Sequence, residues 1–469
     1  MIGNPYLHAS AYWRPIINGC GWEHISSYRH PGEREPRSIN VWASDTDPRP
    51  YRVVHGDAEF SLFAAVHPID DPPDSAEVLA EIRDMSGKHH SFVLWFEGEQ
   101  SAVIPFDPNA AIEAFWFERF VPAANRTVLP PAILSAYYSV KPLVPSGIRR
   151  QLRKVITARA LKAETLLSWP SDRSLDRLMQ LLLVLILKTT RRDSLSFLWF
   201  WPDRHPWAAI LTHDVETAAG LAHVPDIVEI EMERGLRSSF NLVPYDYEVG
   251  GPLLSDLHDA GFEVGVHGYT HDGLMFSEWS TFLKRAVAVN EVGRQWGAVG
   301  FRSPATYRNL EWFHLLGFEY DSSVTDTAPF EPQPGGCASV FPYVVGDLVE
   351  LPMTLPQDHT LFGLLGQADS DVWLSKLAEI RDANGMACVL THPDSGNGYI
   401  GVPENEAHYI EVLDFIGDSE AWTPLPRELA RWWHARANAL TGFDGLQRAS
   451  VATARLDSAD CLVILAPKS

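Results

Sequence analysis

From about residue 205, the chain alternates between strand-like and helix-like segments, and this alternation restricts its fold more than any other feature. Strand-like segments lie at residues 208–214, 237–244, 262–268, 298–304, 318–323, 348–353 and 387–393. Helical patterns separate several of them, at residues 224–236, 251–261, 276–297 and 371–385. Such an alternation predicts parallel strands joined by crossover helices. We therefore expect an α/β fold built on a distorted (β/α)7 barrel, related to the eight-stranded design.

The rest of the chain predicts accessory parts around this barrel. Residues 1–127 contain short apolar runs such as EFSLFAAV and HSFVLWFEG, separated by proline and aspartate clusters, which is typical of a β-rich domain. Residues 128–204 have helical character and are expected to form a connector. The barrel would then occupy residues 205–441. Residues 442–469 return to strand-like alternation and are expected to form a β-like tail, which could pack back on the accessory domain.

Composition excludes several classes of protein. With 469 residues, 46% of them hydrophobic, the chain can bury a large core and is not disordered. The net charge of −22 argues against nucleic acid or an anionic membrane as the main partner, because phosphates would be repelled. The four cysteines lie far apart and form no CxxC pair, so neither a zinc ribbon nor a disulfide framework is indicated.

Three segments bear on localisation and partners. The basic stretch 146–167 stands out in an acidic chain; a solvated helix face is the favoured interpretation, and docking to an anionic surface or substrate is the alternative. The N-terminus lacks a basic start followed by an apolar core. The most apolar run, residues 178–188, has about half the ~20 residues that a membrane span needs. We expect a soluble, cytoplasmic protein with no transmembrane segment.

Ionisable residues gather where the predicted strands end. In a (β/α) barrel, the active site is built at the carboxyl ends of the strands. The residues at these positions are His213, Asp214 and Glu216 on the first predicted strand, His267 on the third, Arg302 on the fourth, Asp321 on the fifth and His392 on the last. Turn chemistry alone does not explain five strands with titratable groups at these positions, so we expect a catalytic site here.

Two histidines and two carboxylates in this set suit a metal site. His267 and His271 in HGYTH are spaced so that one cation could bind both imidazoles, although a capping and an exposed histidine would give the same motif. Residues two apart in a strand point to the same side, so Asp214 and Glu216 share a face. One carboxylate can complete a two-histidine, one-carboxylate site while the other acts on substrate. A role in capping the next helix is the alternative for each acid.

Three further residues complete the predicted machinery. Arg302 and Asp321 carry opposite charges on neighbouring strands, and an arginine beside a catalytic carboxylate would keep that carboxylate ionised. A structural ion pair is the alternative. His392 follows an apolar strand and should emerge at the mouth of the barrel, where an imidazole suits a general acid.

In this order, THDVE, HGYTH, FRSP, YDSS and LTHP resemble the five motifs of the polysaccharide deacetylase family, also called carbohydrate esterase family 4. Members of this family are metal-dependent hydrolases that remove acyl groups from N-acylated sugars. The resemblance covers roughly residues 205–395. The wider sequence is similar to an uncharacterised bacterial branch that has an extra N-terminal domain.

The resemblance implies a role for each motif residue. His267 and His271 would bind the metal, Asp214 would be the general base, His392 the general acid, Arg302 would orient Asp214, and Asp321 would support that network. The backbone N–H of Ala305, just after Pro304, would help to hold the oxyanion. The commonest members have adjacent aspartates in the first motif, where this chain has Val215. Glu216 is therefore the expected third metal ligand, with Asp214 as the alternative.

The resemblance also implies the cofactor and the substrate class. We expect a divalent metal, Zn²⁺ first, with Co²⁺, Ni²⁺, Mn²⁺ and Fe²⁺ as alternatives. The expected reaction removes an N-acetyl group from an amino sugar or from a glycan, glycolipid or metabolite that contains one. A deformylase or another amide hydrolase of a small metabolite is the first alternative, and an inactive binding or scaffold protein is the second.

His359, beside Asp358, is a candidate substrate contact, although a loop-stabilising role is favoured. A homo-oligomer is left open.

Overall fold

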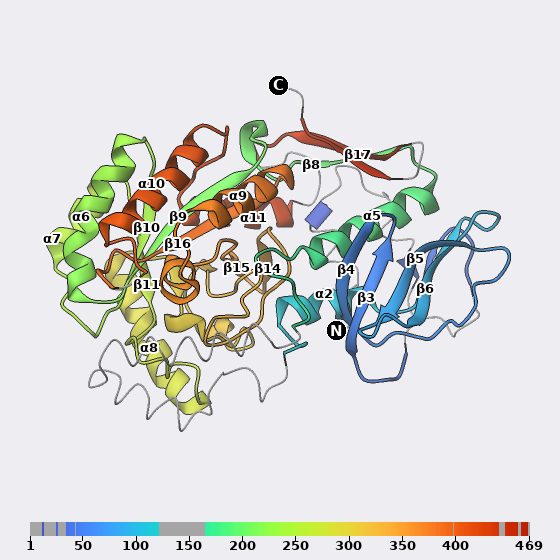
Figure 1. Cartoon of the computed structure of the whole chain (residues 1–469), viewed down its shortest axis with the longest axis horizontal. Helices are drawn as coiled ribbons and strands as arrows, with labels where there is room; N and C mark the ends of the chain where they lie inside the picture. Colours follow the sequence, from blue (N-terminus) through green and yellow to red (C-terminus); the bar gives the residue numbers. More distant parts are fainter. Residues whose placement is uncertain are drawn as a thin grey trace.

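The computed structural model describes residues 12–13, 25–26, 34–42, 44–121, 165–396, 398–439, 446–457 and 461–467. Arg149 to Lys162, which carry the basic character of the connector, lie outside the described residues. Within the described part, the strands form three sheets, of eight, seven and three strands. Figure 1 shows the largest sheet surrounded by helices, and the seven-stranded sheet on the other side of the molecule.

The eight-stranded sheet contains all seven predicted parallel strands. Its strands are β9 (Ala208–Val215), β10 (Ser238–Leu242), β11 (Glu263–His267), β12 (Gly300–Arg302), β13 (Tyr320–Asp321), β14 (Tyr343–Val345), β15 (Leu348–Glu350) and β16 (Met386–Thr391). They follow the order β14-β15-β13-β12-β11-β10-β9-β16. All neighbours are parallel except β14 and β15, which are antiparallel. The expected α/β architecture is confirmed.

Strand β9 lies deep in this sheet, between β10 and β16. All eight of its residues are buried, as expected for a parallel strand that is covered on both faces. The covering helices are α6 (Ala218–Glu233), α7 (Gly251–Asp259), α8 (Trp279–Trp296), α9 (Asp371–Asp382), α10 (Pro403–Gly417) and α11 (Pro426–Asn438). Figure 1 shows them around the outside of the strands, so the carboxyl ends of the strands meet at one end of the fold.

The sheet curls toward a barrel because the segment after β15 runs beside β16. The amide of Leu355 donates to the carbonyl of Cys388 at 3.3 Å. The hydroxyl of Thr354 donates to the carbonyl of Met386 at 2.9 Å and accepts from the amide of Cys388 at 2.8 Å. Between the segment after β15 and strand β16, one backbone hydrogen bond and two hydrogen bonds of the Thr354 hydroxyl thus take the place of regular β-sheet pairing. The barrel is therefore distorted, as predicted.

The N-terminal region is β-rich, as expected. Its sheet has the order β1-β2-β7-β6-β5-β3-β4. The strands are β1 (Ile25–Ser26), β2 (Ile39–Val41), β3 (Arg49–His55), β4 (Ala58–Ala64), β5 (Glu77–Asp84), β6 (His89–Phe96) and β7 (Ser101–Ile104). Helix α2 (Pro108–Trp116) follows, with Asp107 as its N-cap, which accepts from the amides of Asn109 and Ala110.

The long apolar run of the sequence forms a buried helix, α5 (Ser174–Thr190). It packs against strands of the N-terminal sheet and against β17 (Val451–Leu456). Strand β17 pairs antiparallel with both β8 (Ser194–Leu198) and β18 (Leu462–Leu465), so the C-terminal tail joins β8 in a sheet of its own. Among the described helices, none combines the length and the apolarity that crossing a bilayer requires.

A buried ion pair ties the N-terminal region to the barrel. The Nε of Arg308 donates to Oε2 of Glu118 at 2.7 Å, and the amide of Gly336 donates to the other oxygen of Glu118 at 2.6 Å. The rings of Trp116 and Tyr343 stack beside this pair, 5.1 Å between centroids. Because both charges are buried, loss of either partner would leave an uncompensated charge, and the junction is therefore specific.

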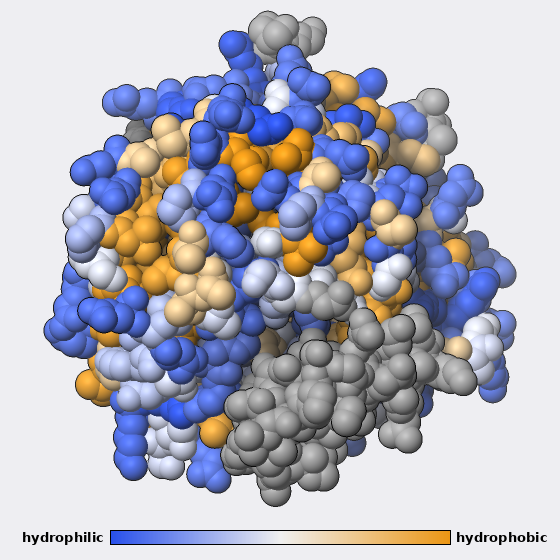
Figure 2. Space-filling view, turned by 60° about the vertical axis from the view of Figure 1, so that its left-hand side comes forward, coloured by the Kyte–Doolittle hydropathy of each residue, from blue (hydrophilic) through white to orange (hydrophobic). Residues whose placement is uncertain are grey.

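The surface follows the acidic composition. The chain has 60 Asp and Glu residues against 38 Lys and Arg residues. Figure 2 shows a surface that is largely hydrophilic on the face that it presents, with smaller groups of apolar residues between the hydrophilic ones.

Candidate active site

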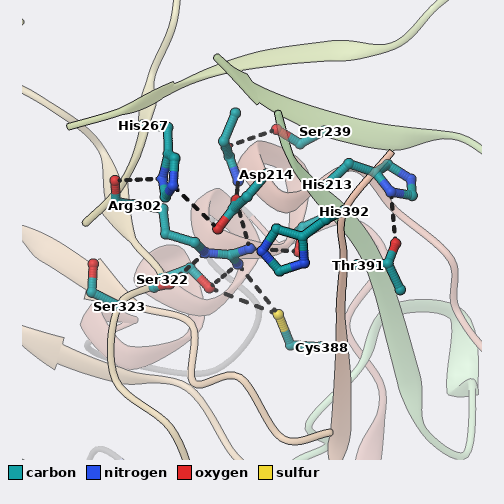
Figure 3. Close-up of polar contacts among 12 residues, drawn as sticks. His213, Asp214, Ser239, His267, Arg302, Ser322, Ser323, Cys388, Thr391 and His392 are labelled. Atoms are coloured by element: carbon teal, nitrogen blue, oxygen red, sulfur yellow. Dashed lines mark hydrogen bonds and ion pairs between the residues drawn. The ribbon is translucent and has the colours of Figure 1, made fainter. Parts of the chain in front are cut away.

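Strand β9 sends Thr212 and Asp214 into the barrel and His213 to the outside. The ring of His213 contacts Thr391 through Nδ1 (2.8 Å) and the carboxylate of Glu231 on α6 through Nε2 (2.7 Å). Figure 3 shows the His213 side chain pointing away from Asp214, toward Thr391. This two-residue alternation of a strand separates a structural histidine from the candidate catalytic aspartate.

Asp214 is buried among three polar partners. Its Oδ1 accepts from Nδ2 of Asn241 at 2.8 Å and from Nη1 of Arg302 at 3.2 Å, and its Oδ2 lies 3.7 Å from Nε2 of His267. Asn241 fits because the next strand has a glycine opposite it. A Cβ at Gly265 would lie 2.1 Å from Oδ1 of Asn241. The sequence thus provides the space that this hydrogen-bond network needs.

The charges around Asp214 keep it ionised. Burial alone would raise its pKa, but the positive charges of His267, Arg302 and His392 outweigh burial and lower the pKa below its usual value. Burial lowers the pKa of His267 itself to about 4, so this imidazole is neutral at pH 7. The positive charges that remain around Asp214 at neutral pH are therefore those of Arg302 and His392.

Arg302 is fixed by contacts along its whole guanidinium. Nε donates to the carbonyl of Ser322 and Nη2 to the hydroxyl of the same residue, both at 2.7 Å. Nη1 donates to Oγ1 of Thr212 at 2.8 Å as well as to Asp214. Figure 3 shows the guanidinium beneath Asp214, with Ser322 on its far side. The buried arginine can therefore orient the carboxylate without moving.

The two motif histidines lie side by side, with their ring centroids 5.4 Å apart. Nδ1 of His267 lies 3.2 Å from the carbonyl oxygen of Arg302 and donates to it, so Nε2 carries the lone pair that faces the interior. His271 is held by its backbone amide, which donates to Asp246 at 2.6 Å, and its Nε2 lies 2.9 Å from Oε1 of Glu216.

Glu216 directs its carboxylate into the site and does not cap the following helix. Thr217 is the N-cap of α6 and accepts from the amide of Gly220 at 3.2 Å. The backbone amide of Glu216 donates to Asp394 at 3.0 Å. Its Oε2 accepts from the hydroxyl of Tyr399 at 2.9 Å, while Oε1 faces His271.

His392, at the end of β16, is held by Asp358. The backbone amide and Nδ1 of His392 donate to the two carboxylate oxygens of Asp358, at 2.8 and 2.7 Å. Nε2 of His392 lies 3.8 Å from Oε1 of Glu216. Burial would lower the pKa of His392, but the charge and the hydrogen bond of Asp358 raise it to about 10. The imidazole is thus protonated at neutral pH and can donate a proton.

The other predicted site residues are placed around this cluster. Asp321 accepts from the amide and hydroxyl of Ser323 at 2.8 and 2.9 Å and lies opposite Glu350 on β15. Burial raises its pKa to about 6. The structure thus pairs Asp321 with a second carboxyl group and gives it no direct contact with Asp214 among the described residues.

The predicted oxyanion and substrate residues lie in two short helices, the 3₁₀-helix η5 (Pro304–Thr306) and the π-helix η7 (His359–Leu365). A Cβ at Gly268 would come within 2.4 Å of Cδ of Pro304, so the glycine after His267 lets the loop after β12 pack closely. Ala305 has left-handed backbone angles, φ 53° and ψ 23°. The ring of His359 lies 5.6 Å from that of Tyr399.

Tyr399 and the role of Asp358 as partner of His392 were not predicted from the sequence. Asp358 lies 34 residues before His392, with a whole helix between them. The glycine-rich run around Tyr399, SGNGYIG, was the available signal of a tight loop near the last motif.

The donor atoms are of the types that bind a divalent cation such as Zn²⁺. Among the described residues, no group of three or more His, Cys, Asp or Glu side chains is arranged so that it could hold a metal ion. However, His267 is a neutral imidazole whose Nδ1–H is bonded to a backbone carbonyl, the usual state of a metal-binding histidine. His271 and Glu216 add a second imidazole and a carboxylate beside it. The donor chemistry therefore fits, although the carboxylate contacts a histidine directly.

Comparisons with known proteins found resemblances to solved structures over about half of the chain. Neither a protein-family model nor a curated protein sequence matches the chain. A Mycobacterium smegmatis protein assigned as a polysaccharide deacetylase is 25% identical, with a TM-score of 0.42, over 52% of this chain and 94% of its own. A family 4 carbohydrate esterase from Streptomyces lividans, in complex with acetate, is 12% identical with a TM-score of 0.31, over 46% of this chain and 91% of its own.

A third solved structure, named Puue allantoinase, is 14% identical with a TM-score of 0.41, over 51% of this chain and 93% of its own. Over about half of its length, the chain thus resembles solved polysaccharide deacetylases and family 4 carbohydrate esterases, as the five sequence motifs predicted.

Proposed function

We propose that the chain is a metal-dependent hydrolase that removes an acyl group, N-acetyl first, from an amino sugar or a compound that contains one. One observation carries this proposal. A carboxylate held by an arginine, Asp214 with Arg302, and an imidazole held by a carboxylate, His392 with Asp358, meet at the same end of the barrel. A base and an acid in this arrangement are what the cleavage of an amide bond requires.

Asp214 is the base of the proposed reaction. Asn241 and Arg302 both bind Oδ1, and Oδ2 is the oxygen that faces His267. Because the nearby positive charge keeps this carboxylate ionised, it can accept a proton from the attacking water. Arg302 and Asn241 hold Oδ1, so the carboxylate cannot rotate away from that water.

His392 is the acid of the proposed reaction. Asp358 binds Nδ1, so Nε2 is the nitrogen that can deliver a proton to the departing amine. The anionic partner also stabilises the charged imidazolium before the transfer. Each proton-transfer residue should contribute on the order of 10²- to 10⁴-fold to the rate.

His267, His271 and Glu216 would hold the divalent cation, with Zn²⁺ expected and Asp214 as the alternative carboxylate. When bound, such a cation supplies Lewis acidity toward the substrate carbonyl and toward water. The loop of Pro304 and Ala305 lies next to these residues, and the backbone amide of Ala305 would help to stabilise the oxyanion.

The test compares three substrate types with the zinc-loaded full chain. We expect release of acetate from N-acetylglucosamine oligomers, and little release of formate from N-formyl sugars or opening of cyclic amides. His392→Ala should abolish the release, whereas Ala substitution of the exposed His258 on α7 should not. Turnover of a cyclic amide or a formyl sugar alone would overturn the substrate assignment. Full activity of His392→Ala would overturn the mechanism.

A further inference from the structure

The hydroxyl of Tyr399 contacts the oxygen of Glu216 that points away from the histidines. It donates to Oε2 at 2.9 Å, while Oε1 lies 2.9 Å from Nε2 of His271 and 3.8 Å from Nε2 of His392. One carboxylate thus has its two oxygens engaged by different groups. The hydroxyl thus helps to hold the carboxylate with one oxygen toward the imidazoles.

The same tyrosine contacts the candidate acid through its ring. The ring centroids of Tyr399 and His392 are 4.6 Å apart, with the planes inclined by 32°. Tyr399 therefore contacts a group from the candidate metal site and a group from the proton-donating pair. Neither contact serves the fold of the barrel strands, because all three side chains lie beyond the strand ends.

The loop that carries Tyr399 is anchored on the catalytic groups. The amide of Ile400 donates to Oδ2 of Asp358 at 3.1 Å, which is the oxygen that also accepts from the amide of His392. Asn405 donates to the carbonyl of Tyr399 at 3.0 Å. A Cβ at Gly401 would lie 2.1 Å from the carbonyl oxygen of Pro393, so this loop packs tightly on the segment after β16. The backbone that carries Tyr399 is therefore held against Asp358 and the segment after β16.

We propose that Tyr399 is a positioning residue that holds the Glu216 carboxylate in the orientation it would need as a metal ligand and aligns this carboxylate with His392. This inference rests on the proposed metal site. A hydrogen bond to the distal oxygen holds a carboxylate ligand in one orientation, and loss of such outer contacts typically weakens metal binding 10- to 100-fold. Without the hydroxyl, the Glu216 carboxylate would lose the contact that holds its orientation and would be a weaker ligand.

The test uses Tyr399→Phe, which keeps the ring on His392 and removes only the hydroxyl. Zinc affinity is measured on the full chain by competition with a chromogenic chelator, and coordination by the visible absorption of the Co²⁺-loaded protein. We expect zinc affinity to fall at least about tenfold and the Co²⁺ spectrum to change, with the melting temperature of the metal-free protein unchanged. Tyr245→Phe, at a tyrosine that is 48% exposed, is the matched control and should change neither.

The outcomes separate this inference from the proposed function. If Glu216→Gln weakens zinc binding while Tyr399→Phe leaves affinity within twofold and the Co²⁺ spectrum unchanged, the role of Tyr399 is overturned and the metal site stands. If the wild-type chain binds neither Zn²⁺ nor Co²⁺, the proposed metal site fails and this inference fails with it.

Discussion

Arg302 on β12 and Asp214 on β9 are joined by a 3.2 Å contact across the interior of the barrel. Two strands, β10 and β11, separate them in the sheet. Both side chains are buried, so the contact is little screened by water. The geometry therefore gives the carboxylate a fixed charge partner and a fixed orientation at the same time.

Replacement of this arginine by lysine should impair turnover and leave the charge in place. Arg302→Lys keeps one positive charge but cannot reproduce the contacts to Thr212, Asp214 and Ser322 together, because an ammonium lacks the planar fork of donors. We expect kcat on the N-acetyl substrate to fall at least about tenfold, with a smaller change in KM. A kcat within twofold of wild type would show that charge alone suffices.

A methyl group at position 265 should disturb Asp214 indirectly, through its partner Asn241. Gly265→Ala would place Cβ 2.1 Å from Oδ1 of Asn241, so Asn241 must move away from Asp214. We expect a loss of about 1–3 kcal/mol in the free energy of unfolding and a clear fall in kcat. Gly98→Ala, where no atom lies within 4 Å of the added methyl group, is the control for urea denaturation and kinetics. Equal behaviour of the two variants would contradict the packing argument.

Loss of the negative charge beside His392 should slow the chemical step. The carboxylate of Asp358 accepts from the amides of His359, His392 and Ile400 and from the imidazole of His392. Asp358→Asn replaces one of its two acceptor oxygens by a donor and removes the charge that favours the imidazolium. We expect kcat to fall on the order of 10²-fold, with the protein still folded by circular dichroism. Asp369→Asn, at an exposed aspartate before α9, should retain wild-type kcat. Normal turnover by Asp358→Asn would contradict the proposed role of His392 as the general acid.

A buried glutamate at the start of β11 should make stability depend on pH. Burial raises the pKa of Glu263 from 4.5 to about 7, although Tyr320 and the amide of Arg427 donate to it. A raised pKa means that the folded state holds the proton more tightly. Its contribution to stability is therefore present below about pH 4.5 and is lost as the pH rises through 7.

Glu263→Gln isolates this contribution. The stability of wild type relative to the variant should fall by about 3 kcal/mol between pH 4.5 and pH 8, by urea denaturation at both pH values. Glu229→Gln, at an exposed residue of α6, should show no such trend. A constant difference for Glu263→Gln would mean that the pKa of Glu263 is not raised in the folded protein.

The sequence predicted the parts of the fold that local patterns determine. The strand and helix periods located all seven parallel strands, and the two-residue alternation placed Asp214 and Glu216 on one face and His213 on the other. These features depend on neighbouring residues alone, so they can be read without the tertiary structure.

Contacts between distant segments could not be predicted in the same way. Asn241 meets Asp214 only because β10 and β9 pair in that register, and Asp358 meets His392 only after a helix has returned the chain to the sheet. The pairing of Asp321 with Glu350 likewise depends on β13 lying next to β15. Strand order and register depend on packing between distant segments, and this packing cannot be read from a single sequence.

The central claim is that Asp214 is the base of a metal-dependent deacetylase. The most direct test measures zinc content and acetate release for wild type and Asp214→Asn in the same preparations. We predict about one zinc ion per chain in both proteins, and acetate release from N-acetylglucosamine oligomers that is on the order of 10²- to 10⁴-fold slower in the variant. Undiminished release by Asp214→Asn, or loss of zinc from it, would contradict this account.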